Sequence, residues 1–240
     1  MKIKEILYEG KAKKIYQTND DNVLVQFFKD DATAFNGVKH EIMNDKGKVN
    51  NFISAHIMSL LTDHGIKNHF IKRIDNFSQL INKLTIFPLE VIVRNTASGS
   101  ICKRLGLANG LDLEKPLVEL CYKDDSLGDP FINDDHVELL NIANKEQLSY
   151  IKSEALKINK ILLEMFQNIE IKLVDFKIEF GIDHNGNILL ADEITPDSCR
   201  LWGIKDQTRY DKDLFRLEIG DMIEYYKKLA TKLNISIPND

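Results

Sequence analysis

The chain has few cysteines and no hydrophobic run long enough to cross a membrane. Its three cysteines are Cys102, Cys121 and Cys199, and no two of them have the Cys-x-x-Cys spacing of zinc sites and redox motifs. The N-terminus lacks the apolar core of a secretory signal, and no stretch approaches the roughly 18 apolar residues of a membrane helix. These absences argue against a disulfide framework and favour a reducing, cytoplasmic setting.

The chain also has no excess of positive charge and lacks several catalytic motifs. The formal net charge of the 240 residues is -5, so the chain has no overall positive field that would gather nucleic acid. The six histidines include no His-x-x-x-His pair, which leaves a zinc site or a serine triad without support. Neither a Walker A sequence nor the kinase catalytic loop H-R-D-x-x-x-x-N is present.

The order of the predicted elements indicates an α+β fold with two lobes. Strands are expected at 3–8, 13–18, 22–28, 66–74, 80–87, 89–94 and 117–122, helices at 48–64, 98–105, 148–169 and 217–233, a polar loop at 123–135 and a strand hairpin at 171–194. We therefore expect a small, sheet-rich lobe at residues 1–86 and a larger mixed α/β lobe at residues 87–240. A cleft between two such lobes is a natural ligand site.

The segment from Leu173 to Gly181 alternates strictly between apolar and charged residues. Because strand side chains have a period of two, Asp175, Lys177 and Glu179 share one face. Alternation alone also fits an ordinary strand with one core face and one solvated face.

The Asn185-Gly186 pair that follows is typical of a two-residue β-turn. A turn that tight would set Glu179 directly opposite Asp192. Two neighbouring carboxylates at a partly buried position call for a cation or a shared proton. Mg²⁺ prefers one or two carboxylates together with substrate phosphates. The sequence therefore predicts that Glu179 and Asp192 hold Mg²⁺ carrying the phosphates of a nucleotide.

A glycine and lysine cluster between the first two predicted strands is a candidate phosphate site. Gly10 allows close backbone approach, Ala12 leaves room, and Lys11 and Lys13 share one face if the second strand begins there. Such a turn could cradle a triphosphate. Taken alone, the motif favours an ordinary solvated lysine turn.

Two arginines offer further anion sites. Arg94 ends a predicted buried strand just before a short helix that begins near Ser98. A guanidinium, free backbone N–H groups and the Ser100 hydroxyl would together suit a phosphate, although an Arg–carboxylate pair fits equally well. Arg200 could meet a second phosphate or pair with Asp197.

Four segments, in order, resemble signatures of the phosphoribosylaminoimidazole-succinocarboxamide synthase family. They are residues 8–13 (YEGKAK), 87–100 (FPLEVIVR through SGS), 173–181 with its D-x-K-x-E-F-G core, and 192–202 (DEITPDSCRLW). The resemblance covers nearly the whole chain. It implies a ligase of purine biosynthesis that uses ATP to join L-aspartate to the carboxylate of an imidazole ribonucleotide. It also implies a nucleotide lobe similar to that of protein kinases.

The resemblance further implies roles for individual residues. The ATP phosphates would lie on Gly10, Lys11, Ala12 and Lys13, the adenine beside Phe87 and Glu90, Mg²⁺ on Glu179 and Asp192, the ribonucleotide phosphate on Arg94, Ser100 and Arg200, the imidazole carboxylate and ribose beside Lys177 and Asp175, and other substrate atoms near Asp129 and Asp197. Three residues depart from the family pattern: Cys199 replaces a serine, Asn36 an aspartate, and Ser98 a threonine or alanine.

Two other functions stay open. A kinase would transfer phosphate without ligation, and ADP release that ignores aspartate would reveal it. A non-catalytic nucleotide sensor would not need both Arg94 and Arg200. Small-molecule substrates are expected as partners, and neither nucleic acid nor a membrane is. Bacterial members of the resembled family are often homodimers, and this analogy is the whole basis for expecting one here.

Overall fold

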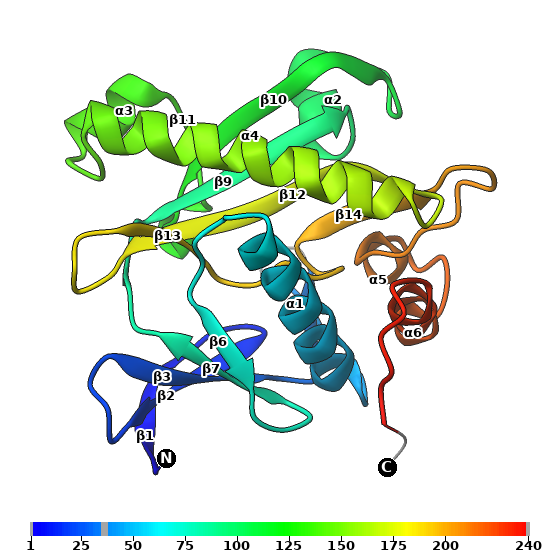
Figure 1. Cartoon of the computed structure of the whole chain (residues 1–240). Coiled ribbons are helices and arrows are strands. Elements are labelled where there is room, and N and C mark those ends of the chain that lie inside the picture. The colour runs from blue at the N-terminus through cyan, green and yellow to red at the C-terminus, as the bar shows by residue number, and fades with distance from the viewer. Residues whose placement is uncertain (1, 35–37, 239–240) are drawn as a thin grey trace.

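The computed structural model describes residues 2–34 and 38–238, and it confirms an α+β fold (Figure 1). Asn36 lies outside the described residues. The strands are β1 (Ile3–Glu9), β2 (Lys13–Thr18), β3 (Val23–Phe28), β4 (Asp31–Ala34), β5 (Lys39–Ile42), β6 (Phe70–Arg73), β7 (Ser78–Asn82), β8 (Thr85–Ile86), β9 (Leu89–Thr96), β10 (Asp112–Tyr122), β11 (Phe131–Ile132), β12 (Ile171–Ile182), β13 (Ile188–Ala191) and β14 (Cys199–Gly203). The helices are α1 (Lys46–Asp63), α2 (Ser100–Leu105), the 3-10 turn η1 (Asp125–Leu127), α3 (Asp134–Leu139), α4 (Lys145–Gln167), α5 (Asp213–Leu217) and α6 (Met222–Lys232).

Two antiparallel sheets organise the molecule. The first has the order β1-β2-β3-β7-β6, and the second has the order β11-β10-β9-β12-β13, with β14 and β8 also pairing with β12. Figure 1 shows α4 running across the second sheet, while α1 descends beside the first. Because β8 joins the second sheet through β12, the last residues of the expected small lobe belong to the larger sheet. The lobe division at residues 86 and 87 stays a prediction.

The long helix α4 covers the second sheet with the apolar stripe that its spacing predicts. Leu148, Ile151, Ala155 and Ile158 are all buried against the common core. The helix begins at a capping box in which the Asn144 side chain accepts a hydrogen bond from the backbone N–H of the third helical residue. Among the described residues, no helix is both long and apolar enough to cross a bilayer.

The hairpin between β12 and β13 has a wider turn than predicted. Its loop comprises residues 183–187, and the Asp183 carboxylate accepts hydrogen bonds from the backbone N–H groups of Asn185 and Asn187, at 2.9 and 2.8 Å. Within this loop only Gly186 has a positive φ, whereas a type I′ turn requires two such residues. The predicted two-residue turn was therefore wrong, because Asp183 stabilises a wider loop.

Other boundaries also differ from the prediction. The expected loop 123–135 contains η1 and the short strand β11, which pairs with β10. The last helix begins only at Met222, because the Asp221 side chain caps its first backbone N–H groups. Strands β4, β5 and β14 were not predicted.

One glycine fixes the packing of α1 against the first sheet. A Cβ atom on Gly47 would lie 2.4 Å from the carbonyl oxygen of Phe28, so Gly47→Ala must shift the helix or β3. We expect this substitution to lower the free energy of unfolding by about 1–3 kcal/mol in urea denaturation. Ser59→Ala, at an exposed position of the same helix, should stay within about 0.5 kcal/mol of the wild type. Equal midpoints for the two variants would contradict the packing argument.

Candidate active site

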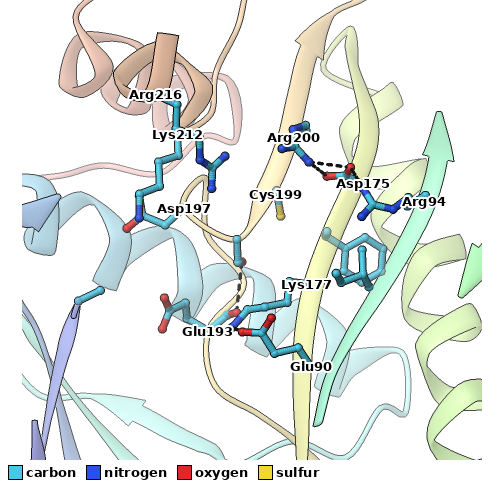
Figure 2. Close-up of a pocket in the computed structure, with 14 residues that line it drawn as sticks. Glu90, Arg94, Asp175, Lys177, Glu193, Asp197, Cys199, Arg200, Lys212 and Arg216 are labelled. Carbon is cyan, nitrogen blue, oxygen red and sulfur yellow. Dashed lines mark hydrogen bonds and ion pairs between the residues drawn. The ribbon is translucent and has the colours of Figure 1, made fainter. Parts of the chain in front are cut away.

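A cavity of about 330 Å³ lies where β9, β12 and β14 meet α5 and the turn between β1 and β2 (Figure 2). It is lined by Ala12, Glu90, Ile92, Arg94, Asp175, Phe176, Lys177, Glu193, Asp197, Ser198, Cys199, Arg200, Lys212 and Arg216. Half of these residues were candidates from the sequence, and nine of the fourteen are charged. The cavity is therefore suited to charged ligands.

A row of three charged residues crosses three adjacent strands at one side of the cavity. Asp175 on β12 pairs in register with Arg94 on β9 and with Arg200 on β14. Its Oδ2 atom accepts hydrogen bonds from Arg94 Nη1 at 2.7 Å and from Arg200 Nη1 at 2.9 Å. Burial raises the pKa of Asp175, and the two guanidinium groups oppose that rise. The row holds two arginines close together beside the cavity.

Both arginines have a second carboxylate partner. Arg94 Nε donates to Glu119 at 2.5 Å, and Arg200 Nε donates to Asp213 at 2.9 Å. The Arg–carboxylate pairing that the sequence left open is thus present for both residues. Arg200 pairs with Asp175 and Asp213 and not with Asp197, which the sequence had suggested as its partner. These contacts hold the guanidinium groups in place, with further donors left on each.

Lys177 lies at the junction of three carboxylates. Its ammonium nitrogen is 3.1 Å from Glu179, 3.2 Å from Glu90 and 3.4 Å from Asp192. Burial alone would lower the pKa of Lys177, but the charges of Glu179 and Glu90 outweigh it and raise the pKa. Lys177 is therefore a permanent positive charge at the cavity.

Asp192 reaches this cluster by a different route from the predicted one. Glu179 pairs with Ala191 in the hairpin, so a regular strand would turn Asp192 to the opposite face. Instead, Asp192 follows the end of β13 and has φ 60°. This left-handed conformation takes it out of the strand, and its carboxylate contacts Lys177 and Lys13. The predicted register was wrong, although both acidic side chains still meet Lys177.

Glu179 and Asp192 could together bind one divalent cation. They suit a cation that takes its other ligands from outside the protein better than one held by protein ligands alone. Both Glu179 oxygens accept from Lys123 at 2.7 Å, while Asp192 is held by Lys13 and Lys177. Across residues 2–34 and 38–238, no three His, Cys, Asp or Glu side chains gather as a metal cluster. A pair of hard carboxylate donors fits Mg²⁺ that takes its remaining ligands from phosphates and water.

The turn between the first two strands sends its lysines to different partners. Gly10 N–H donates to the Lys13 carbonyl at 2.9 Å, which closes the turn. Lys13 contacts both Asp192 and Glu193, which follow β13 of the second sheet. Lys11, which lies before β2, forms an exposed ion pair with Asp125 at 2.8 Å. The sequence had suggested that Lys11 and Lys13 share one face. In the structure their ammonium groups do not share one site.

Three other candidate site residues are not among those that line the cavity. Phe87 is buried in the core, and its N–H donates to the Phe180 carbonyl at 3.0 Å. The Ser100 hydroxyl lies 3.5 Å from Arg94. Asp129 accepts from the backbone N–H of Asp124 at 3.0 Å, within its own loop.

Asp197 has a polar cage of its own. Its carboxylate contacts Lys46 at 2.5 Å, Tyr226 at 2.8 Å and Asn50 at 2.9 Å. Burial alone would raise the pKa of Asp197, but the Lys46 ammonium outweighs it and holds the pKa well below its usual range. Asp197 thus stays ionised between α1 and α6.

Sequence reasoning missed several charged residues at the site. Lys123 belongs to the predicted loop, and Lys46 precedes the predicted start of its helix. Lys212 and Arg216 lie in a stretch without a recognisable motif. The four-residue spacing of Lys212 and Arg216 was the one available signal, since such residues share a face of a helical turn.

Glu179 should make stability depend on pH in the acid range. Burial alone would raise its pKa, but Lys177 and Lys123 outweigh it and lower the pKa from 4.5 to about 2. The ionised Glu179 carboxylate therefore stabilises the folded state in full above the unfolded-state pKa of Glu179. This stabilisation is lost as the pH falls through about 2. That shift corresponds to about 3 kcal/mol. We expect wild-type protein to lose roughly that much more unfolding free energy than Glu179→Gln between about pH 5 and pH 2, measured by urea denaturation at each pH. Parallel pH profiles would contradict this.

Comparison with known proteins places these features in one family. The SAICAR synthetase family model matches residues 6–233. The phosphoribosylaminoimidazole-succinocarboxamide synthase of Bacillus subtilis (strain 168) is 51% identical over 229 residues, covering 95% of each chain. The crystal structure of the synthase from Ehrlichia chaffeensis has 47% identity and a TM-score of 0.95, covering 98% of this chain and 100% of that one. A SAICAR synthetase in complex with ADP has 46% identity and a TM-score of 0.94, with the same coverage. The chain therefore belongs to the SAICAR synthetase family.

Proposed function

We propose that this chain uses ATP to join L-aspartate to the carboxylate of 5-amino-1-(5-phospho-D-ribosyl)imidazole-4-carboxylate, with release of ADP and phosphate, in purine biosynthesis. One observation carries the proposal: the Arg94–Asp175–Arg200 row lies in the same cavity as Lys177 and its partner Glu90. A phosphate-bearing substrate and a reaction between anions need these two features together.

The row is the proposed ribonucleotide site. Arg94 and Arg200 would bind the 5′-phosphate with their remaining N–H donors, because guanidinium groups match phosphate geometry. Ser100 lies close enough to Arg94 to join them. Asp175 would accept hydrogen bonds from ribose hydroxyl groups, as its carboxylate is fixed between the two arginines. The ring carboxylate would then point toward Lys177.

The nucleotide would occupy the opposite side of Lys177. We propose that the Gly10–Lys13 turn binds the phosphates of ATP and that Phe87 and Glu90 lie beside the adenine. Glu179 and Asp192 would hold Mg²⁺, which neutralises phosphate charge when bound. In the structure Lys123 pairs with Glu179 and Lys13 pairs with Asp192. A divalent cation that replaced the two lysines at these carboxylates would free their ammonium groups for phosphate oxygens. Asp129 stays a proposed substrate contact.

The chemistry proceeds in two displacements. An oxygen of the ring carboxylate attacks the terminal phosphorus of ATP, the bond to the bridging oxygen breaks, and ADP leaves. The aspartate amine then attacks the acyl carbon, a C–N bond forms, and phosphate departs with the C–O electron pair while the nitrogen loses a proton. Lys177 stabilises the negative charge that gathers on the carboxylate and phosphate oxygens in both steps.

The test is ADP release by purified protein with ATP, Mg²⁺ and the ribonucleotide, with and without L-aspartate. We expect turnover to require all of them, with the succinocarboxamide detected by mass spectrometry. ADP release at the same rate without aspartate would favour a kinase. ATP binding without ADP release under any condition would favour a nucleotide sensor.

Two further properties belong to this proposal. We propose a cytoplasmic enzyme, in keeping with three cysteines that are all free thiols. We also propose a homodimer, by analogy with the bacterial relatives. Size-exclusion chromatography with light scattering would test the second point, since a single 27.6 kDa species would contradict it.

A further inference from the structure

The charged residues of the cavity fall into three groups. Two of these groups have an assigned ligand in the proposed reaction, and the third does not. Figure 2 shows Arg94, Asp175 and Arg200 on one side, Lys177, Glu90 and Glu193 below, and Asp197, Lys212 and Arg216 on the far side. The first group suits the ribonucleotide phosphate, and the second faces the reacting carboxylate. The third group therefore remains for the third substrate.

Lys212 is the cation in that group that lacks a direct partner. Arg94, Arg200 and Lys177 each have two or more carboxylate contacts. Within the described part of the chain, the Lys212 ammonium forms neither an ion pair nor a hydrogen bond. The charge of Asp197 lies near it, but the Asp197 carboxylate is already held by Lys46, Asn50 and Tyr226.

Backbone contacts fix where Lys212 lies. The buried Asp211 carboxylate accepts from the backbone N–H groups of Leu201 and Asp213, both at 2.8 Å. Lys212 N–H donates to the Pro196 carbonyl at 3.2 Å. The segment is thus anchored to β14 and to the loop before it, so the direction of Lys212 into the cavity is built into the fold.

Arg216 adds a second cation to the same side. It lies one turn further along, with its backbone N–H bonded to the Lys212 carbonyl at 3.0 Å. Among described residues its guanidinium has one ion pair, to Asp213 at 2.7 Å, which leaves most of its five N–H donors for a ligand. Two cations four residues apart, both lining one cavity, form a receptor for two carboxylates.

We infer that Lys212 and Arg216 bind the carboxylate groups of L-aspartate and direct its amine toward the activated carboxylate beside Lys177. This inference rests on the proposed function, which requires a dicarboxylate amine in the cavity. Burial lowers the pKa of Lys212, so its charged form is disfavoured until an anion approaches. A bound carboxylate relieves that cost, whereas a neutral ligand does not.

Steady-state kinetics of Lys212→Met test the inference. We expect the KM for aspartate to rise about 10- to 100-fold, as for the loss of one hydrogen bond to a charged group. The KM values for ATP and the ribonucleotide should stay within about twofold, because uniform binding of one substrate is removed. Succinate has both carboxylates but no amine. Its inhibition constant against aspartate should therefore rise in parallel, and Lys212→Arg should recover part of both losses.

The controls separate this inference from the proposed function. Lys205→Met removes an exposed lysine that pairs with Glu170 outside the cavity and should leave every KM unchanged. Thermal unfolding of each variant checks that it is folded, and Arg216→Met gives a second route to the same loss. An unchanged aspartate KM in Lys212→Met, or an equal rise for the ribonucleotide, would overturn the inference alone. Failure of the wild type to form the amide would overturn the proposed function first.

Discussion

Lys177→Met should lower kcat by about 10³-fold in the fraction of the protein that is folded. The substitution removes the ammonium group that contacts Glu90, Glu179 and Asp192. Two anions, a carboxylate and a triphosphate, must approach each other at this point, and no neutral side chain can offset their repulsion. The measurement is the rate of amide formation at saturating concentrations of all three substrates.

The control for this experiment lies on the same strand. Lys172 also projects from β12, but it pairs with Asp112 away from the cavity. Lys172→Met should keep kcat within about twofold of the wild type, since exposed ion pairs contribute little. If Lys177→Met keeps more than about a tenth of the wild-type kcat, its charge is not used in the chemical steps.

Arg94→Met should destabilise the folded state by about 3–5 kcal/mol. The Arg94 side chain is 3% exposed, and it lies between Glu119 at 2.5 Å and Asp175 at 2.7 Å. Removal of the guanidinium leaves two carboxylates with one cation fewer in a buried setting, which is costlier than the loss of the attraction itself. Urea denaturation monitored by circular dichroism measures the change, and any folded fraction should bind the ribonucleotide more weakly.

Arg104 supplies a matched control, because it contacts the other oxygen of the same glutamate. Arg104 Nη2 donates to Glu119 at 2.5 Å, but its side chain is 33% exposed. Arg104→Met should therefore cost no more than about 1 kcal/mol. Similar losses for the two variants would mean that burial of Arg94 does not set the energy of this network.

The sequence predicted the faces of strands better than the partners of strands. Alternation correctly put Asp175, Lys177 and Glu179 on one side of β12, because the period of two is a local property of the backbone. It could not reveal that Arg94 and Arg200 flank Asp175, since those strands are distant in sequence and pair only in the folded sheet. The family resemblance grouped Arg94 with Arg200 at the phosphate and put Asp175 at the ribose and imidazole carboxylate, whereas the structure joins all three residues in one row.

Local signals also failed where a side chain changed the backbone. The Asn185-Gly186 pair indicated a tight turn, but the Asp183 carboxylate competed for the same backbone N–H groups and widened the loop. Asp192 was expected near Glu179 for the wrong reason, since its left-handed φ, and not the register, takes it out of the strand. Lysines that approach from loops, such as Lys123, carry no periodic signal at all.

Two ion pairs of unequal burial link the loop that follows β10 to the two sheets. Lys123, at its start, contacts buried Glu179 of the second sheet, whereas Asp125 contacts exposed Lys11 in the turn of the first sheet. A polyphosphate that draws Lys123 away from Glu179 would remove this side-chain contact and leave the pair between Asp125 and Lys11. The ends of the loop would stay in the second sheet through β10 and β11, so that nucleotide binding would change only which sheet holds the side chains at the tip of the loop.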